Sequence, residues 1–403
     1  MTERGDILVI GTMDTKAAEL TFVRDRIAAA GETVRIVDVS TSAKGGGADI
    51  GASDIAACHP KGADAVFTGE RGSAVSAMAD ALKHWIGTQH VAGAIGLGGS
   101  GGTALIAPAL RSLPLGVPKL IVSTVAAGNT APYIDTSDLI LAPSVTDIGG
   151  LNRVSRPILA NAAAAIVGMV RAEPVAAEAD RPAIGCTMFG VTTACVTAAT
   201  EALSDDFDCI VFHATGTGGR SMEDLAVQGR LDGILDLTTT ELCDRLAGGI
   251  MPAGPDRIDR LASLGLPYVG SVGALDMVNF GAPETVPERY ADRTFYHHNP
   301  QITLMRTTVD ESAALGREIG ESLNRFEGPV EFLLPEGGVS ALDSAGQPFD
   351  DPEAREALFA AIEQTVETTG SRRVRRLPHN INDPAFADAA ADALRKMMEE
   401  KTT

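Results

Sequence analysis

The stretch from Val91 to Thr103 constrains the fold more strongly than any other part of this 403-residue chain. It begins with a short apolar segment, passes through a glycine-rich turn and continues with helical spacing to about Leu110. Glycine lets the backbone turn tightly and approach a ligand closely, and the start of a helix presents unpaired N–H groups that suit an anion. The stretch therefore predicts a strand, a phosphate-binding turn and a helix in succession.

The same succession of apolar strand, polar turn and helix recurs along the chain. We expect strands at residues 7–10, 34–39, 63–67, from 91, 119–124, 139–141, 183–187, 209–212, 233–237, 267–271, 302–306, 330–334 and 374–377. Strands that alternate with helices pair in parallel and build a doubly wound sheet. Residues 174–182 lack apolar periodicity and indicate a linker. The prediction is an α/β protein of two doubly wound subdomains with largely parallel sheets, residues 1–173 and 183–403, with a final helix at 385–398 that could pack on either.

The charge of the chain and its cysteines indicate which classes of partner and which compartment to expect. The chain carries 33 basic and 53 acidic residues, and the resulting formal charge of −20 opposes a nucleic-acid backbone. Its five cysteines lack paired short spacings, which indicates reduced thiols instead of a disulfide framework or a thiolate zinc site. No segment approaches the ~18 consecutive apolar residues of a membrane span. We therefore expect a cytoplasmic protein with no nucleic-acid partner and no membrane partner.

Residues 96–101 match the dinucleotide fingerprint G-x-G-x-x-G, with an expected strand before it and a helix after it. In that fold the next strand ends, about 20 residues on, in an acid that holds the ribose, whereas here it ends in Ser123 and Thr124. A mononucleotide or another phosphorylated ligand is therefore favoured over NAD. The alternative is that the glycines only allow strand and helix to pack closely. The residues expected to face the phosphates are Gly98, Gly99, Ser100, Gly101, Gly102 and Thr103.

A second candidate loop follows the first expected strand and combines hydroxyls, a carboxylate and a lysine. A phosphate could meet helix N–H groups and Lys16 there, and Asp14 could hold Mg²⁺ through water. The loop is not a Walker A motif, which requires G-x-x-x-x-G-K-[ST]. The alternative for Asp14 and Thr15 is that one of them is only the N-cap of the helix. Asp38 stands where a ribose-binding acid would stand, and the alternative for it is a solvated carboxylate at a strand end. The candidates are Gly11, Thr12, Asp14, Thr15 and Lys16 in this loop, together with Asp38 near the C-terminal end of the next expected strand.

The second half contains one dense polar cluster after an expected strand. His213 stands at the strand end and could carry a proton, although such a histidine is more often structural. Arg220 suits a phosphate or carboxylate, and His379 lies in a further polar loop. No segment has metal-ligand spacing, so no metal site is predicted. The glycine loop between His213 and Arg220 adds four further candidates for ligand binding: Gly216, Thr217, Gly218 and Gly219.

Four motifs taken together resemble one protein family, in order along the chain: residues 11–20, 96–103, 212–219 and 379–383. The family is the ATP-binding family typified by the N-terminal inhibitory region of the tomato mosaic virus resistance protein. The resemblance covers essentially the whole chain. It implies two Rossmann-like α/β subdomains, ATP binding and a homodimer, and it supplies no reaction.

The leading expectation is thus an ATP-binding protein. ATP, with or without Mg²⁺, would lie at the carboxyl ends of the first sheet's strands, facing the cleft between the subdomains, with adenosine near Asp38 and phosphates near residues 98–103. A second reading is a metabolic enzyme for a small carboxylated or phosphorylated substrate, with Arg220 clamping the anion and His213 or His379 moving protons. A third is a regulatory protein with ATP as a structural ligand. No complete nucleophile–base set is visible, so the sequence leaves open whether the protein is an enzyme.

Overall fold

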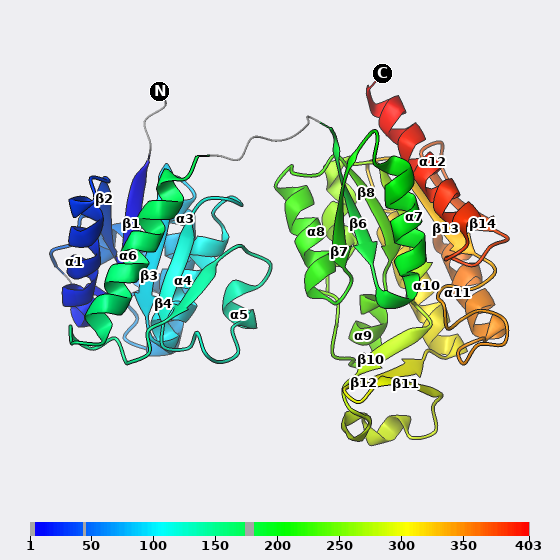
Figure 1. Cartoon of the computed structure of the whole chain (residues 1–403), viewed down its shortest axis with the longest axis horizontal. Coiled ribbons are helices and arrows are strands. Elements are labelled where there is room, and N and C mark those ends of the chain that lie inside the picture. Colours follow the sequence, from blue (N-terminus) through cyan, green and yellow to red (C-terminus); the bar gives the residue numbers. More distant parts are fainter. Residues whose placement is uncertain (1–4, 43–45, 174–180, 403) are drawn as a thin grey trace. The chain divides into compact units, whose positions relative to one another are not determined.

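The computed structural model describes residues 5–42, 46–173 and 181–402 (Figure 1). The chain divides into two compact units, residues 1–176 and 177–403. Most of the predicted linker, residues 174–180, lies outside the described residues. Each unit is built on one parallel sheet whose strands alternate with helices, so the predicted α/β fold with two Rossmann-like subdomains is confirmed.

The first unit has a five-stranded parallel sheet in the order β2-β1-β3-β4-β5. Its elements are β1 (Asp6–Gly11), α1 (Met13–Ala29), β2 (Val34–Asp38), α2 (Ala52–Ala56), α3 (Arg71–Ile86), β3 (Val91–Gly98), α4 (Ser100–Arg111), β4 (Lys119–Ser123), α5 (Ala131–Ile134), β5 (Ile140–Pro143) and α6 (Ser155–Arg171). One face of the sheet packs against α1 and α6 and the other against α3 and α4. Because both faces are covered, the strands are nearly continuous apolar runs.

The prediction of a strand at residues 63–67 is wrong. Residues Ala63–Ala65 form a short 3₁₀ helix that leads from α2 to α3. In the sheet, β3 pairs directly with β1 on one side and β4 on the other, so no place remains for a further strand there. Val66 is buried and Phe67 is half-buried, and both pack with α3 and α4. The apolar run that resembled a strand therefore covers helices.

The second unit has a six-stranded parallel sheet in the order β14-β13-β9-β8-β6-β7. Its main elements are β6 (Ala183–Met188), α7 (Thr193–Leu203), β7 (Asp208–His213), α8 (Thr217–Val227), β8 (Gly233–Thr238), α9 (Glu241–Ala247), β9 (Tyr268–Gly273), α10 (Val309–Leu323), β13 (Val330–Pro335), α11 (Pro352–Thr365), β14 (Arg372–Leu377) and α12 (Pro384–Thr402). Helices α7 and α12 cover one face, and α8, α10 and α11 cover the other. The final helix thus packs on the second unit.

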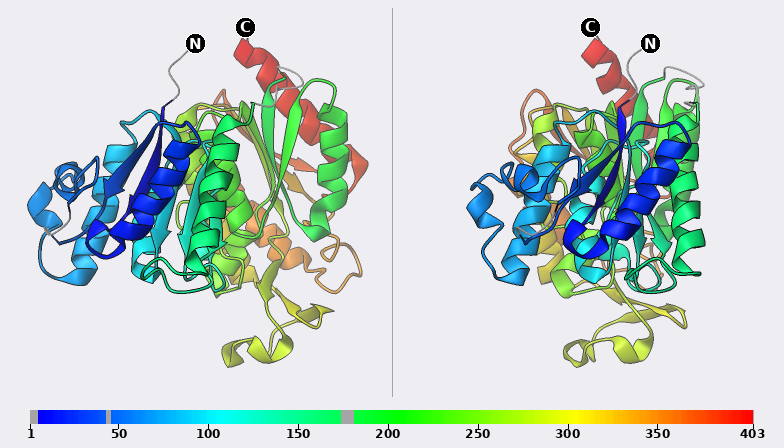
Figure 2. Two further views of the ribbon diagram at one scale, coloured as in Figure 1. Left: turned by 60° about the vertical axis from the view of Figure 1, so that its left-hand side comes forward. Right: turned by 90° about the vertical axis from the view of Figure 1, so that its left-hand side faces the viewer.

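The two sheets share one winding order. In each, the first strand lies between the second and the third, and later strands continue outward on the side of the third. The second unit adds a sixth strand and an antiparallel lobe of three strands in the order β10-β12-β11. The lobe consists of β10 (Met277–Phe280), two 3₁₀ turns (Pro283–Thr285 and Glu288–Tyr290), β11 (Phe295–Asn299) and β12 (Ile302–Arg306). Figure 2 shows it standing away from the six-stranded sheet.

One predicted strand of the second parallel sheet lies in this lobe instead. Residues 302–306 do form a strand, but β12 pairs antiparallel with β10 and β11 and takes no part in the parallel sheet. The turn between β11 and β12 is only two residues long, Pro300 and Gln301, which is typical of an antiparallel hairpin. None of the described helices is long and apolar enough to cross a membrane.

Candidate functional site

The two glycine-containing loops predicted in the first unit follow neighbouring strands. Residues 11–16 follow β1 and residues 98–103 follow β3, and the two strands pair in parallel with Ile10 opposite Gly96. With the strand order 2-1-3-4-5, the connections diverge to either side between β1 and β3. Open α/β sheets bind ligands outside the carboxyl ends of the strands at such a point. The fold therefore brings both predicted loops to the edge where a ligand is expected.

The glycines after β3 are of two kinds. A Cβ added at Gly98 would lie 2.8 Å from the backbone of Gly102, so close packing of β3 on α4 requires glycine there. Gly99, Gly101 and Gly102 are different, since an added Cβ would meet nothing nearer than 3.6 Å. Packing therefore accounts for Gly98 alone. The other three leave the backbone at the start of α4 open to a close approach from outside.

The start of α4 is not satisfied by the chain itself. No side chain caps this helix, and Ser100 at its first position is exposed. Thr103 plays a structural part instead, because it is buried and its hydroxyl lies 2.6 Å from the Ser123 hydroxyl at the end of β4. A helix of this length with free N–H groups at its first turn favours an anion.

Arg71 lies beside this helix start. It is the first residue of α3, which packs alongside α4, and its Nη2 is 3.7 Å from the point that a Cβ of Gly101 would occupy. The residue is exposed, and it forms no ion pair with any other side chain that the structure describes. Arg71 is not predicted from the sequence, because it precedes Gly101 by 30 positions and only the packing of α3 on α4 brings the two together.

The N-terminus of α3, in contrast, is already occupied. The carboxylate of Glu70 accepts hydrogen bonds from the N–H groups of Gly72 and Ser73 at 2.9 and 2.6 Å. Bonds from Ser73 and Gly72 lower the pKa of Glu70 to about 2. The chain thus supplies its own anion at α3 and leaves the neighbouring α4 open.

A pocket of about 380 Å³ lies at the carboxyl ends of β4 and β5. Its lining is rich in hydroxyl groups and consists of Ser123, Thr124, Ala127, Pro143, Ser144, Val145, Thr146 and Asp147. The Thr124 hydroxyl is 3.6 Å from the point that a Cβ of Gly99 would occupy, so the pocket adjoins the start of α4. The loop after β5 carries no motif that marks it as part of a site, so the sequence did not predict this component.

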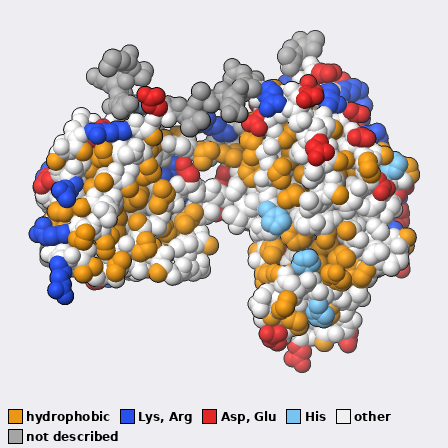
Figure 3. All heavy atoms as spheres, in the orientation of Figure 1, with side chains coloured by type: hydrophobic (Ala, Val, Ile, Leu, Met, Phe, Trp, Pro, Cys, Tyr) orange, Lys and Arg blue, Asp and Glu red, His pale blue; other side chains and the backbone are white. Residues whose placement is uncertain are grey.

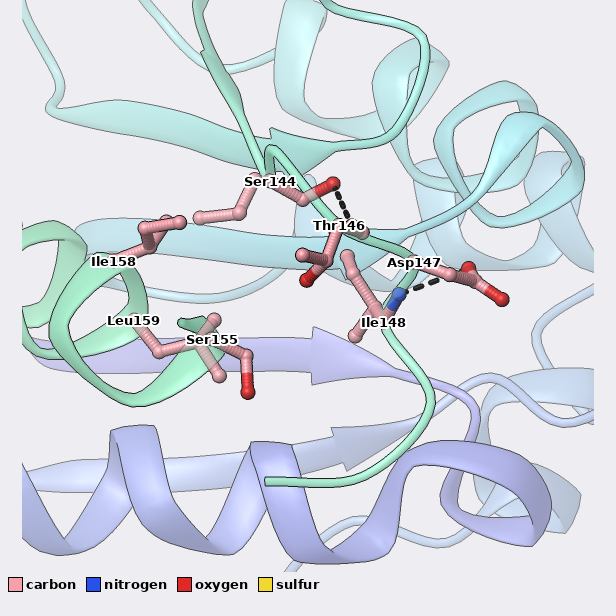
Figure 4. Close-up of a pocket in the computed structure, with 8 residues that line it drawn as sticks. Ser144, Thr146, Asp147, Ile148, Ser155, Ile158 and Leu159 are labelled. Carbon is pink, nitrogen blue, oxygen red and sulfur yellow. Dashed lines mark hydrogen bonds between the residues drawn. The ribbon is translucent and has the colours of Figure 1, made fainter. Parts of the chain in front are cut away.

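Val145 in this loop has an uncommon backbone. Its φ is +63° and the residue is 77% exposed. The Thr146 N–H donates to the Ser144 carbonyl at 2.7 Å, which closes a γ-turn around Val145, and the Ser144 hydroxyl donates to the Thr146 carbonyl at 2.6 Å (Figure 4). A β-branched residue at positive φ is strained by about 1–3 kcal/mol, and such strain concentrates at functional sites.

The loop after β1 lies at the same edge, but much of its polar chemistry is used within the fold. The Lys16 ammonium donates to the Ile148 carbonyl at 2.5 Å, and the hydroxyls of Thr12 and Thr15 lie 2.7 Å apart. The N-cap of α1 is Thr12, without a side-chain cap bond, so neither Asp14 nor Thr15 is the N-cap. Asp14 accepts instead from the hydroxyl of Ser42.

Asp38 is buried, and its Oδ1 already accepts hydrogen bonds from within the chain, so that oxygen is not available to a ribose. It is 1% exposed, and its Oδ1 accepts from the N–H of Met13 and from the N–H and hydroxyl of Ser40 at 2.9, 2.9 and 2.5 Å. The carboxylate therefore occupies the N-terminus of α1 and ties it to the end of β2. The structure assigns a local structural contact to Asp38 and leaves its predicted ligand role without direct support.

In the second unit, the glycine loop after β7 meets an internal anion. The Gly216 N–H donates to Glu241 Oε2 at 2.5 Å. A Cβ at Gly218 would lie 1.8 Å from the His213 carbonyl oxygen, and one at Gly219 would lie 1.8 Å from Glu241 Oε1. Gly216 has φ +80° and packs on the Pro252 carbonyl. Packing thus accounts for these glycines, unlike those at the start of α4.

Glu241 belongs to a buried charged cluster. Arg257 donates to Glu241, Asp236 and Glu223 at 2.6, 2.8 and 3.2 Å, and the Tyr268 hydroxyl donates to Asp236 at 3.0 Å. Burial raises the pKa of Glu223 and of Glu241, although Arg257 opposes the shift. The cluster crosslinks α8, α9, β8 and the segment after α9, which indicates a structural role.

The three predicted catalytic candidates are not gathered at one point. His213 ends β7 and His379 follows β14, and these strands form opposite edges of the six-stranded sheet, five strand spacings or roughly 24 Å apart. His213 stacks on Phe189 with 5.4 Å between ring centres, and its Nδ1 lies 3.2 Å from the Met188 carbonyl. Arg220 is in the first turn of α8, the helix that follows β7 and His213. Within residues 5–42, 46–173 and 181–402, no three His, Cys, Asp or Glu side chains are grouped to hold a metal ion.

Comparison with known proteins gives matches along nearly all of the chain. Models described as the N-terminal and C-terminal domains of an uncharacterised protein family (UPF0261) match residues 5–175 and 181–398. A UPF0261 protein of Mesorhizobium japonicum is 57% identical over 96% of this chain and 97% of its own length. The ToMV resistance protein Tm-1(GCR237) of Solanum lycopersicum is 44% identical over 96% of this chain, but the match spans only 55% of the tomato protein.

Proposed function

This chain belongs to the uncharacterised protein family UPF0261, and from the geometry of its first unit we propose that it binds ATP at the carboxyl edge of the five-stranded sheet. The phosphates lie at the start of α4, and the nucleoside lies toward the pocket at the ends of β4 and β5. The resemblance noted in the sequence suggests ATP, and the geometry of the site supports a ligand of that chemistry.

The observation that carries the proposal is the open glycine backbone at an uncapped helix start. Gly99, Gly101 and Gly102 have no packing partner that excludes a side chain, yet all three are glycine. A phosphate group needs close approach to backbone N–H groups, which a Cβ would obstruct. The loop after β7 has no such open backbone, because packing explains each of its glycines and Glu241 accepts from the Gly216 N–H.

Arg71 supplies the positive charge that a triphosphate requires. The whole chain has a formal charge of −20, so a polyanion needs a local cation to overcome the general repulsion. A guanidinium offers paired N–H donors that match phosphate oxygens. In the proposed complex Arg71 and the α4 N–H groups contact the same phosphate chain from two sides.

The pocket beside α4 has room for a nucleoside. Its volume of about 380 Å³ falls within the range of small-molecule sites, which is about 300–1,000 Å³. The Thr124 hydroxyl suits a ribose or base hydrogen bond, and the exposed Asp147 carboxylate suits the water shell of Mg²⁺ brought by ATP. The metal would offset phosphate charge there. Asp38 has no part in this arrangement because the fold buries it.

We extend the proposal to a cytoplasmic homodimer, which the family resemblance suggests. All five cysteines are free thiols and three of them are buried, as suits a reducing compartment. Light scattering on the purified chain would test the assembly, since a mass near twice 41.7 kDa is expected and a monomer would contradict it.

Calorimetric titration of the whole chain with ATP, ADP, AMP, inorganic phosphate and NAD, each with and without Mg²⁺, tests the ligand. We expect affinity to fall in the order ATP, ADP, AMP, because each phosphate removed loses contacts at α4 and Arg71. NAD should bind weakly because its ribose lacks an acid partner after β4. Failure of any nucleotide to bind more tightly than millimolar would reject the proposal.

A further inference from the structure

The antiparallel lobe contains a pocket that the proposed nucleotide site does not use. Its volume is about 180 Å³, and it lies between the 3₁₀ turns of the lobe and one face of the β10-β12-β11 sheet. Most of its lining is apolar, and the full lining consists of Pro283, Val286, Pro287, Glu288, Ala291, Phe295, His297 and Thr303. Figure 3 shows hydrophobic and histidine side chains on this part of the second unit, above an acidic tip.

Thr303 is the buried polar residue of this lining, whereas Glu288 and His297 are exposed. It stands on the central strand β12, with Phe280 opposite it on β10 and His297 opposite it on β11. The residue is 1% exposed, and its hydroxyl has no hydrogen-bond partner among the described residues. A buried hydroxyl without a partner costs about 1–3 kcal/mol. A ligand atom that reached Thr303 would remove that cost.

We propose that this pocket binds a small uncharged molecule with a compact apolar body and one hydrogen-bonding oxygen, of about the size of phenol. A volume of 180 Å³ corresponds to the liquid volume of about six water molecules. Pro283, Val286 and Phe295 provide the apolar contacts for the body. The oxygen points to the Thr303 hydroxyl, which can donate or accept.

The polar groups of the pocket argue against a charged ligand. Glu288 is exposed and its carboxylate would repel a carboxylate or phosphate. A cation is disfavoured at the inner wall as well, because Glu288 and His297 are exposed, Thr303 is buried, and a buried unpaired charge is far more costly than a buried neutral group. His297 is exposed on the same face of the sheet and can hydrogen-bond to the ligand oxygen or to water beside it.

Ligand-observed NMR titration of the full chain with phenol, toluene and benzoate tests the proposal. We expect saturable phenol binding, weaker toluene binding and no benzoate binding. Thr303→Val keeps the shape of the side chain and removes the hydroxyl, so it should weaken phenol at least fivefold and leave toluene unchanged or tighter. Thr294→Val, an exposed threonine of the same lobe outside the pocket lining, is the matched control and should change neither.

A second variant distinguishes a loss of ligand binding from a loss of folding. Ala291 is exposed at the pocket, so Ala291→Leu should fold normally and fill the space, which would abolish both phenol and toluene binding. Absence of saturable phenol binding to the wild-type chain at millimolar concentration would overturn the proposal. Phenol affinity that resists both Thr303→Val and Ala291→Leu would overturn it equally, because the ligand would then lie elsewhere.

Discussion

The Arg71 guanidinium lies 3.7 Å from the point that a Cβ of Gly101 would occupy, so a cation from the start of α3 stands beside the first turn of α4. The two helix starts are treated differently by the chain. Glu70 fills the N-terminus of α3 with its own carboxylate, whereas α4 has no side-chain cap. An anion from outside the chain therefore has one open helix start and one arginine within reach.

Arg71→Ala should weaken ATP binding about tenfold or more, because a hydrogen bond to a charged group contributes about 1.5–3 kcal/mol. Arg71→Lys should recover part of the loss, since it restores charge without the paired donors. Calorimetric titration measures both. Arg373→Ala, an exposed arginine on β14 of the other unit, is the control and should bind as wild type. Equal affinity of Arg71→Ala and wild type would remove Arg71 from the site.

The two classes of glycine after β3 predict opposite effects on stability. Gly98→Ala places a carbon 2.8 Å from the backbone of Gly102, which cannot move without shifting α4, so we expect a loss of about 1–3 kcal/mol. Gly99→Ala meets nothing nearer than 3.6 Å and should cost little. Urea denaturation compares the free energies of unfolding. Equal losses at the two positions would show that the distinction has no energetic basis.

The buried arginine of the second unit should dominate stability there. Arg257→Leu leaves Glu223, Asp236 and Glu241 buried without a cation, and breaking such a cluster costs about 3–5 kcal/mol. Part of the loss should return at low pH, where Glu223 and Glu241, whose pKa values burial raises, take up protons. Arg260→Leu, three residues on and partly exposed, is the matched control and should cost under about 1 kcal/mol. Equal denaturation midpoints for the two variants would contradict this account.

Asp276, just before β10, should make stability depend on pH. Burial raises its pKa from 3.8 to about 7, with the neighbouring Asp343 adding to the shift. The folded chain therefore keeps this proton between about pH 4 and pH 7 while the unfolded chain releases it, so stability falls as pH rises, by up to about 1.4 kcal/mol per pH unit. Asp276→Asn mimics the protonated form, which accepts from the Ser340 hydroxyl, and should lack this contribution.

Urea denaturation at pH 5 and pH 8 measures the effect as a difference between Asp276→Asn and wild type. Relative to wild type, the variant should be more stable at pH 8 than at pH 5. Asp244, whose pKa burial raises to about 6, titrates in both proteins and cancels in the comparison. The same difference at both pH values would show that Asp276 is ionised throughout.

The sequence predicted both sheets because most of their strands are short apolar runs that alternate with helical segments. An apolar run does not distinguish a strand from a buried turn, so residues 63–67 predict a strand, whereas Val66 packs under helices. Of the antiparallel lobe, the sequence predicted only the strand at residues 302–306, and not its antiparallel pairing. Strand β10 has only four residues and β11 is largely exposed, so neither carries enough apolar periodicity to predict a strand.

The candidate site was predicted in part. The turn after β3 was found because its glycines are adjacent in sequence and follow a strand. Arg71 was missed because only the packing of α3 on α4 brings it near, and Val145 was missed because valine gives no sign of a positive φ. Sequence also could not reveal that Glu241 and Asp38 already occupy the other helix starts, since each reaches them from a different element.

The central claim is that the open turn after β3 binds the phosphates of ATP, and calorimetric titration of Gly99→Val tests it most directly. The backbone of Gly99 is extended, with φ −76° and ψ −164°, so valine fits without strain and projects into the proposed phosphate position. Gly370→Val, at a glycine of the second unit with nothing within 4 Å, is the matched control. We predict that wild type and Gly370→Val bind ATP alike and that Gly99→Val retains its fold but shows no measurable binding. ATP binding by Gly99→Val with wild-type affinity would contradict the account.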